Sequence, residues 1–327
     1  MGDAIVIRGI SKTYRSGGET VNALDSVSLA IREGEIFGLL GPNGAGKTSL
    51  ISILAGILAP DAGYAEVVGL NCSKEAKKAQ EVLNVVSGFT GVIYSLSVEE
   101  ALMYYALLYN VRDAKKKIAS VIKLVRLENA RHLEADDLSS GMKQRYQIAK
   151  ALLSDPCVLI LDEPTVGLDV ESAITIRDIV KRLRKEGRTI LLTTHNLFEA
   201  EELCDRMAFI NHGKILATGT VDELKERLVR KRTIEINCSD SQEVVERLSK
   251  IKGVNATVKS GRLALVSVDS YARMKDIMAA LAGVKSEIYN LSALEPTLEE
   301  TYLRIINNKA GKRGARGATG KEEGLIE

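Results

Sequence analysis

The 327-residue sequence has no long hydrophobic run. Its longest uncharged apolar windows, Ser49–Pro60 and Ala101–Val111, fall well short of the roughly 18–20 residues that a membrane-spanning helix needs. The N-terminal stretch Met1–Arg8 carries both Asp3 and Arg8, so it does not resemble a signal peptide. We therefore expect a soluble chain that associates with a membrane only through another protein.

Cysteine is scarce and charge is balanced. None of Cys72, Cys157, Cys204 and Cys238 belongs to a CxxC pair or has a histidine at metal-ligand spacing. We expect all four to be small buried residues in a reducing cytosol. The chain has 45 Lys and Arg against 43 Asp and Glu, a formal net charge of +2. Composition alone therefore indicates neither a nucleic-acid nor a lipid partner.

Residues 1–230 alternate between short apolar strands and helical segments. Glu35–Leu40, Cys157–Leu161 and Thr189–Thr193 are apolar runs that each lead into helix-like sequence. This alternation predicts a parallel α/β sheet covered on both faces, with an antiparallel β subdomain near the start of the chain. A helical subdomain is expected at about residues 95–155, where Ser97-Val-Glu-Glu100 has the pattern of a capping box. A second helix there has one apolar face, formed by Ile118, Val121, Ile122 and Val125.

The pattern changes after residue 230. Residues 231–306 contain two helical segments among four strand-like runs, in the order βαββαβ. This order predicts a small α+β, ferredoxin-like accessory domain. Residues 307–327 carry almost no apolar side chains, and we expect a disordered tail.

A glycine-rich segment carries the first chemical signal. Gly41-Pro-Asn-Gly-Ala-Gly46-Lys47-Thr48 fits the GxxxxGK[ST] phosphate loop and lies between a predicted strand and a predicted helix. Its glycines let consecutive N–H groups point at phosphate oxygens, and the helix N-terminus favours the anion. Lys47 is expected to reach the β- and γ-phosphates, and Thr48 to offer its hydroxyl to Mg2+.

A second signal indicates hydrolysis. The apolar strand Val158–Leu161 ends in Asp162 and Glu163, and a buried parallel strand delivers such carboxylates to the carboxyl edge of the sheet. Asp162 is expected to hold Mg2+ through water, and Glu163 to orient or deprotonate the attacking water. Upstream, Leu138-Ser-Ser-Gly-Met-Lys-Gln-Arg145 predicts a further anion-binding helix end. The phosphate loop already binds the phosphates of the chain's own nucleotide, so a second anion-binding helix end would be redundant there. We therefore expect it to bind the nucleotide of another subunit.

With these motifs in order, residues 4–230 resemble the ABC ATPase family, whose signature reads LSGGQ or LSGGM. The family has Gly where this chain has Ser140. The resemblance implies two cassettes packed head to tail, each signature closing on the partner's ATP. It also implies that Asp169 lies at the subunit contact, that His195 contacts the γ-phosphate, and that Tyr14 stacks on adenine. Residues 231–306 resemble, more loosely, the C-terminal extension of export-type relatives.

These interpretations define the candidate site. Its expected ligands are ATP and Mg2+. The predicted residues are Tyr14, Gly41, Pro42, Asn43, Gly44, Ala45, Gly46, Lys47, Thr48, Ser49, Ser139, Gly141 and Asp169 for the nucleotide, Lys47, Glu163 and His195 for catalysis, and Thr48 and Asp162 for the metal.

One residue of the family pattern is missing. The family places a glutamine after the strand that precedes the helical insertion, where it contacts Mg2+ and couples to the membrane subunit. Here Gly88 or Phe89 occupies that position, and neither side chain can bind a metal. A backbone carbonyl or a water molecule would have to replace the glutamine as a ligand of Mg2+.

The resemblance implies a P-loop ATPase subunit that powers export through a separate membrane-spanning permease, on the inner face of the cell membrane, as a homodimer with ATP at its interface. The alternative is a soluble ABC ATPase that acts on ribosomes or nucleic acid. Ribosome-acting relatives usually carry two cassettes, whereas this chain has one phosphate loop. Chromosome-acting relatives insert long coiled coils, but no sustained heptads lie between Lys47 and Ser139. The pattern leaves open the transported substrate and whether the partner cassette is identical.

Overall fold

The computed structural model describes residues 2–16, 19–88, 93, 95–226, 232–268, 273–294, 297–303 and 305. The chain divides into two compact units, Met1–Val221 and Asp222–Glu327, at the start of α8 (Val221–Glu226). The predicted tail at residues 307–327 lies outside the described residues.

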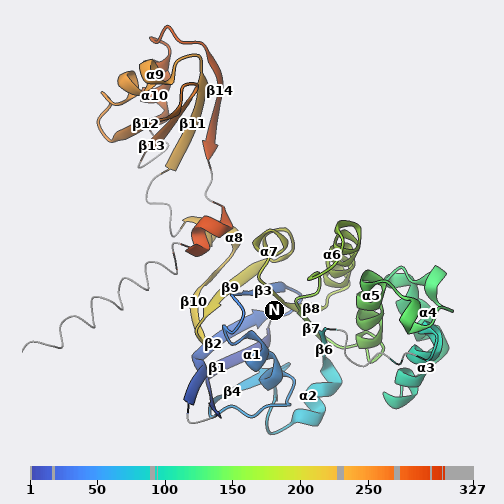
Figure 1. Ribbon diagram of the computed structural model, residues 1–327. Helices are drawn as coiled ribbons and strands as arrows, with labels where there is room; N and C mark the ends of the chain where they lie inside the picture. The colour runs from blue at the N-terminus through green and yellow to red at the C-terminus, as the bar shows by residue number, and fades with distance from the viewer. Residues whose placement is uncertain are drawn as a thin grey trace, which may run out of the picture. The chain divides into compact units, whose positions relative to one another are not determined.

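A six-stranded sheet forms the centre of the first unit, in the order β10-β9-β3-β8-β7-β6 (Figure 1). All neighbours that pair within β9-β3-β8-β7-β6 run parallel, and β10 is antiparallel to β9. The apolar runs of the sequence became its central strands because such runs are stable where both faces are covered. The strands are β3 (Ile36–Leu40), β6 (Leu83–Ser87), β7 (Val158–Asp162), β8 (Thr189–Thr194), β9 (Arg206–Asn211) and β10 (Lys214–Gly219).

A four-stranded antiparallel sheet lies beside it, in the order β2-β1-β4-β5. Its strands are β1 (Asp3–Ser16), β2 (Glu19–Arg32), β4 (Ala62–Val67) and β5 (Leu70–Asn71). Helix α1 (Lys47–Leu54) buries apolar side chains in one core with strands of both sheets. Helices α6 (Val170–Lys185) and α7 (Leu197–Leu203) pack on β8, and α2 (Ala76–Val82) packs on β6.

The predicted helical subdomain comprises α3 (Val98–Leu108), α4 (Ala114–Leu124) and α5 (Ser140–Ala151). The expected capping box is present: the Glu100 N–H donates to Ser97 Oγ at 3.3 Å, and the Ser97 N–H donates to the Glu100 carboxylate at 2.9 Å. The predicted apolar face of α4 is buried, with Ile118, Val121 and Ile122 all at most 4% exposed.

The second unit has the predicted order of strands and helices. Its sheet order is β12-β13-β11-β14 with antiparallel neighbours throughout, which is the ferredoxin-like arrangement. The fold class predicted from the sequence is therefore confirmed for both units. The elements are β11 (Arg232–Cys238), α9 (Ser241–Leu248), β12 (Val254–Ser260), β13 (Leu263–Val268), α10 (Met274–Leu281) and β14 (Ile288–Leu294).

The cysteines are free, and three of them are buried as expected. Burial raises the pKa of the Cys72 thiol to about 11. Cys157 is exposed, and the expectation of burial was wrong for it because β7 begins only at Val158, leaving Cys157 in the preceding turn. Within the described residues, no helix is both long enough and apolar enough to cross a bilayer.

Tyr146 supplies a prediction about stability. Its side chain on α5 is 0% exposed, and its hydroxyl has no hydrogen-bond partner among the described residues. Tyr146→Phe removes this buried polar group, so we expect the free energy of unfolding to rise by about 1 kcal/mol. Chemical denaturation measures the change, with the half-exposed Tyr104→Phe as the control. A Tyr146→Phe protein less stable than the parent would show that the hydroxyl is satisfied in solution.

Candidate functional site

The predicted phosphate loop connects β3 to α1. Gly46 caps α1 at φ 107°, in the left-handed region, and a Cβ there would overlap the carbonyl of Ala23. Glycine is therefore required by both backbone conformation and space. The Lys47 side chain is buried, and its Nζ donates to the carbonyl of Gly41 at 2.6 Å. The loop thus presents a helix N-terminus with a buried ammonium group beside it, which suits an anion.

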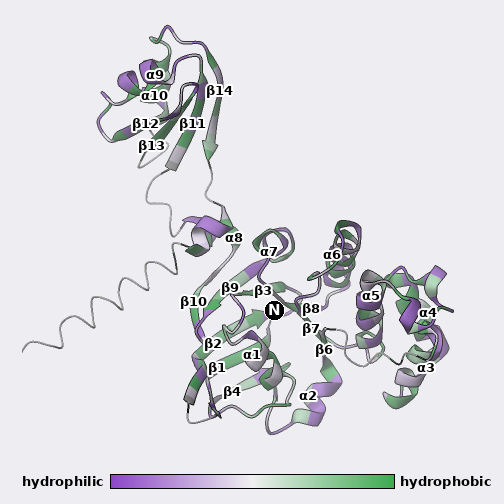
Figure 2. Ribbon diagram, in the orientation of Figure 1, coloured by the Kyte–Doolittle hydropathy of each residue, from purple (hydrophilic) through white to green (hydrophobic). Residues whose placement is uncertain are grey.

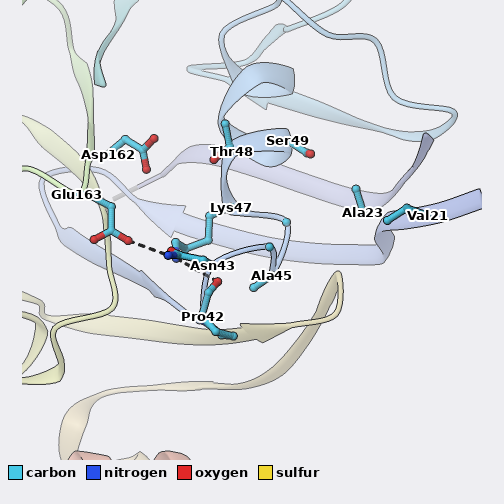
Figure 3. Close-up of a pocket in the computed structure, with 12 residues that line it drawn as sticks. Val21, Ala23, Pro42, Asn43, Ala45, Lys47, Thr48, Ser49, Asp162 and Glu163 are labelled. Atoms are coloured by element: carbon cyan, nitrogen blue, oxygen red, sulfur yellow. Dashed lines mark hydrogen bonds and ion pairs between the residues drawn. The ribbon is translucent and has the colours of Figure 1, made fainter. Parts of the chain in front are cut away.

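An open pocket of about 300 Å3 lies over this loop (Figure 3). β2 provides one wall, the loop and the start of α1 the floor, and the end of β7 the opposite wall. Of the predicted nucleotide residues, those from Pro42 to Ser49 line it. The full lining is Val21, Ala23, Pro42, Asn43, Gly44, Ala45, Gly46, Lys47, Thr48, Ser49, Asp162 and Glu163.

The two acids stand at the carboxyl edge of the parallel sheet. Asp162 ends β7 and accepts hydrogen bonds from the Thr193 hydroxyl of β8 and, at 3.4 Å, from the Ser87 hydroxyl of β6. Hydroxyls of both neighbouring strands therefore fix its orientation. Glu163 follows with φ 52°, an uncommon conformation for a residue with a side chain, and its N–H donates to the Thr193 carbonyl at 2.9 Å.

The structure brings the three predicted catalytic residues together. One Glu163 carboxylate oxygen lies 3.4 Å from Lys47 Nζ, and the other lies 2.7 Å from His195 Nδ1. Figure 3 shows the Glu163 side chain pointing toward Lys47 across the pocket. Lys47 thus carries a carboxylate partner that an incoming phosphate would replace. Once released from Lys47, Glu163 could act on water beside the phosphate.

The residues present fit a magnesium ion bound with a nucleotide. Mg2+ prefers oxygen ligands and usually keeps several waters, taking one or two protein oxygens plus phosphates. Thr48 and Asp162, both lining the pocket, offer a hydroxyl and a carboxylate. Among the described residues, no group of three or more His, Cys, Asp or Glu side chains is arranged to hold a metal by itself. The donor set therefore matches a metal shared with phosphates rather than a protein-only site.

The predicted adenine residue lies near the pocket but does not line it. The Tyr14 hydroxyl is 3.2 Å from Ser49 Oγ, and its ring is 42% exposed. On the neighbouring strand, Val21 pairs directly with Tyr14. Val21 and Ala23, two apart on β2, face the pocket and were missed by sequence reasoning. The feature that would have identified them is the β1–β2 register, which the sequence alone does not determine.

The signature residues form their own cluster at the N-terminus of α5. Ser139 caps this helix, and its Oγ accepts from the Met142 N–H at 3.2 Å. Gly141 packs against the start of α6, where a Cβ would overlap Ser172 Oγ. Ser172 in turn donates its N–H to Asp169 at 2.8 Å, which holds the pKa of Asp169 below its usual range.

In the described residues, neither Ser139, Gly141 nor Asp169 lines the pocket of its own chain. The structure therefore separates these predicted nucleotide residues from Lys47.

The position of the missing glutamine is partly described. Gly88 lies in an exposed turn with φ 55°, and no atom lies within 4 Å of a Cβ built there. Phe89, the other residue assigned to this position, lies outside the described residues. Gly88 has no side chain to offer a metal, and the nearest described hydroxyl in sequence, Ser87, is bonded to Asp162.

Comparisons with known proteins agree with this geometry. The model of the ABC transporter family matches residues 24–166, and that of the DrrA1-3-like ATP-binding protein C-terminal domain matches residues 219–306. The chain is 36% identical over 313 residues to the Nod factor export ATP-binding protein I of Rhizobium johnstonii, covering 94% of this chain and 96% of that protein. It is 33% identical to the linearmycin resistance ATP-binding protein LnrL of Bacillus subtilis over 90% of this chain and 96% of that one.

A solved structure is also similar to this chain in its fold. A dimeric ATP-binding cassette in a post-hydrolysis state, bound to ADP and Pi, is 25% identical to this chain, with a TM-score of 0.61. The match covers 66% of this chain and 98% of that one. Fold and site together define an ATP-binding cassette ATPase. The chain belongs to the ABC transporter family, as the sequence motifs predicted, with a DrrA-like C-terminal unit.

Proposed function

We propose that this chain is the ATP-hydrolysing subunit that drives export through a separate membrane-spanning permease. The observation that carries the proposal is the contact of Glu163 with both Lys47 and His195 at the mouth of the phosphate-loop pocket. The relatives support the direction of transport, because their names describe Nod factor export and resistance to linearmycin and doxorubicin. These names favour transport over the alternative role on ribosomes or nucleic acid.

The proposed chemistry uses the residues in fixed positions. The loop N–H groups and Lys47 would bind the phosphates. Thr48 would hold Mg2+ directly and Asp162 through water, and the ion would neutralise charge on the phosphates. Glu163 orients the attacking water and accepts its proton. His195, whose Nδ1 lies 2.7 Å from Glu163, would contact the γ-phosphate.

The proposed active unit is a homodimer with ATP between its subunits. Within one chain, Ser139 and Gly141 lie outside the pocket that contains Lys47. A head-to-tail pair would bring the N-terminus of α5, with its positive helix dipole, to the partner's γ-phosphate. The similarity to a dimeric cassette supports this arrangement.

An exposed apolar surface on α3 supports a permease partner. Tyr104, Leu107 and Leu108 are 51%, 68% and 60% exposed, although side chains of this kind are usually buried. Figure 2 shows hydrophobic colour along α3, and the helix carries no charge beyond its first turn. We propose that this α3 surface binds the permease at the cytoplasmic face of the membrane.

Co-purification with a co-expressed membrane-spanning permease tests this proposal. Leu107→Glu combined with Leu108→Glu places two charges on the α3 surface, so we expect recovery of the complex and permease-stimulated ATPase activity to fall by about 10-fold or more. ATP affinity should not change, because α3 does not line the pocket. Ile57→Glu is the matched control, since Ile57 is 79% exposed in the turn after α1. Normal assembly of the double variant would exclude the α3 surface. Failure of the parent chain to bind any membrane-spanning protein would contradict the transport function.

Gly88 provides a test of the metal site. Gly88→Gln restores an amide oxygen near Mg2+, so we expect the Mg2+ concentration for half-maximal ATPase activity to fall. Gly88→Ala is the control, because both substitutions strain the left-handed backbone by about 1 kcal/mol but only one adds a ligand. We propose that water takes the place of the missing glutamine at Mg2+, and an identical Mg2+ titration for the two variants would contradict this proposal.

We further propose that residues 231–306 are an accessory domain that tunes dimer lifetime or regulation. No phosphate-contacting motif falls in this range, and its described residues form their own apolar core. In this proposal the permease, and not this chain, determines which substrate is exported.

A further inference from the structure

Glu199 is a fully buried carboxyl beside the catalytic residues. It lies on α7, which begins just after His195 and is capped by Asn196 through hydrogen bonds from the Phe198 and Glu199 N–H groups. The side chain of Glu199 is 0% exposed. The Thr165 hydroxyl donates to Glu199 Oε1 at 2.8 Å.

This hydrogen bond joins two catalytic segments. Thr165 belongs to the turn from β7 to α6 that begins at Glu163, and Glu199 belongs to the helix that follows His195. Glu163 is also tied to β8, through its N–H and the Thr193 carbonyl. The contact between Glu163 and His195 is therefore held on the strand side by Thr193 and on the helix side by the bond from Thr165 to Glu199.

Burying the carboxyl of Glu199 costs free energy, so packing alone does not explain why a carboxyl occupies this position. Its Oε2 atom has no hydrogen-bond partner among the described residues. The nearby Arg177 directs its Nε to Glu202 at 3.0 Å instead. Burial raises the pKa of Glu199, opposed by hydrogen bonds from Thr165 and Thr194 and by the charge of Arg177, and reinforced by Glu163. An apolar side chain of similar size would avoid this penalty.

We propose that Glu199 is a positioning residue for ATP hydrolysis: by accepting the hydrogen bond of Thr165, it fixes the turn that carries Glu163 against the helix that follows His195. The inference rests on the proposed catalytic roles of Glu163 and His195. Without the bond, the turn loses its tie to α7, and the carboxylate of Glu163 can move away from the water it orients. Displacement of a catalytic group by about 1 Å can cost about 100-fold in rate.

Kinetics of the full-length chain test the proposal. Glu199→Ala and Thr165→Val each remove the bond, so we expect kcat to fall by about 10- to 100-fold while the Kd for ATP stays within about 2-fold. Glu199→Gln and Thr165→Ser keep an acceptor and a donor and should retain most of the activity. The double variant Glu199→Ala with Thr165→Val should be no slower than the slower single variant, because both remove one interaction. Glu201→Ala, at an exposed position of the same helix, is the control.

A spectroscopic measurement separates this inference from the proposed function. The chain has three histidines, so the ring signal of His195 can be assigned by NMR in the nucleotide-free protein. It should shift in Glu199→Ala and Thr165→Val but not in Glu201→Ala, whether or not Glu163 proves catalytic. An unmoved signal with an unchanged kcat would overturn the proposal. The proposal would also be overturned if kcat fell as far in the Glu199→Gln and Thr165→Ser proteins as in Glu199→Ala and Thr165→Val. A loss confined to ATP affinity or to folding would overturn it as well. Should Glu199→Ala not fold, Thr165→Val provides the same readouts.

Discussion

Glu163→Gln is expected to lower kcat by about 10²- to 10⁴-fold while ATP still binds. The amide is nearly the same size as the carboxylate and can still accept a hydrogen bond, but it cannot take a proton from water. It also removes the negative charge 3.4 Å from Lys47 Nζ, so Lys47 is freed for the phosphates and nucleotide affinity should be retained or rise. Hydrolysis is then blocked after binding, and the ATP-bound dimer should accumulate.

Two measurements check this result. Single-turnover assays, with the permease where activity requires it, report kcat, and size exclusion with ATP reports the dimer. Glu186→Gln is a suitable control, since Glu186 lies at the C-terminal end of α6 and pairs with Arg182 away from the pocket. Parental turnover in the Glu163→Gln protein would remove Glu163 from the catalytic role.

Lys47→Ala should fail at an earlier step. Lys47 provides the buried positive charge nearest the phosphate loop, where it bonds to the carbonyl of Gly41. Its loss therefore weakens nucleotide binding itself, whereas Glu163→Gln spares binding. The contrast between the two variants assigns separate roles to two residues that touch each other in the nucleotide-free protein.

The sequence predicted most of what is local in the chain. The phosphate loop, the acidic end of β7 and the capping box of α3 are each encoded within a few consecutive residues, because glycines, carboxylates and caps act on the backbone next to them. The order of strands and helices was also predictable, since apolar runs and helical spacing are local patterns. The ferredoxin-like order of the second unit followed from the same reasoning.

Contacts between distant segments were not predictable in the same way. Val21 lines the pocket from β2, where the β1–β2 register pairs it with Tyr14. Glu199 looks in sequence like any solvated helical glutamate, yet its carboxylate is buried and accepts a hydrogen bond from the Thr165 hydroxyl. Gly141 carries a motif, but its packing against Ser172 depends on how α5 meets α6. Each of these depends on register or packing angle, which a single sequence does not determine.

The cluster of Ser139, Gly141 and Asp169 leads to a second large effect. Ser139→Arg should abolish most ATPase activity, because in the proposed head-to-tail dimer a long side chain would occupy the N-terminus of α5 where the partner's phosphate would bind. The Ser139 cap is worth only about 1 kcal/mol, so the subunit should still fold and still bind nucleotide through its own Lys47. Circular dichroism and binding of a fluorescent ATP analogue check both points.

Mixing Ser139→Arg subunits with Lys47→Ala subunits should restore activity that neither has alone. In a mixed dimer, Lys47 of the first subunit faces Ser139 of the second, so one composite site is intact and the other has lost both groups. Random pairing of equal amounts gives mixed dimers half of the time, so about one quarter of the parental sites are expected to be intact. Occluded ATP per dimer reports these sites directly, even where turnover requires both. If each single variant hydrolyses ATP normally as a monomer, the pocket around Lys47 is complete within one chain and the head-to-tail arrangement is wrong.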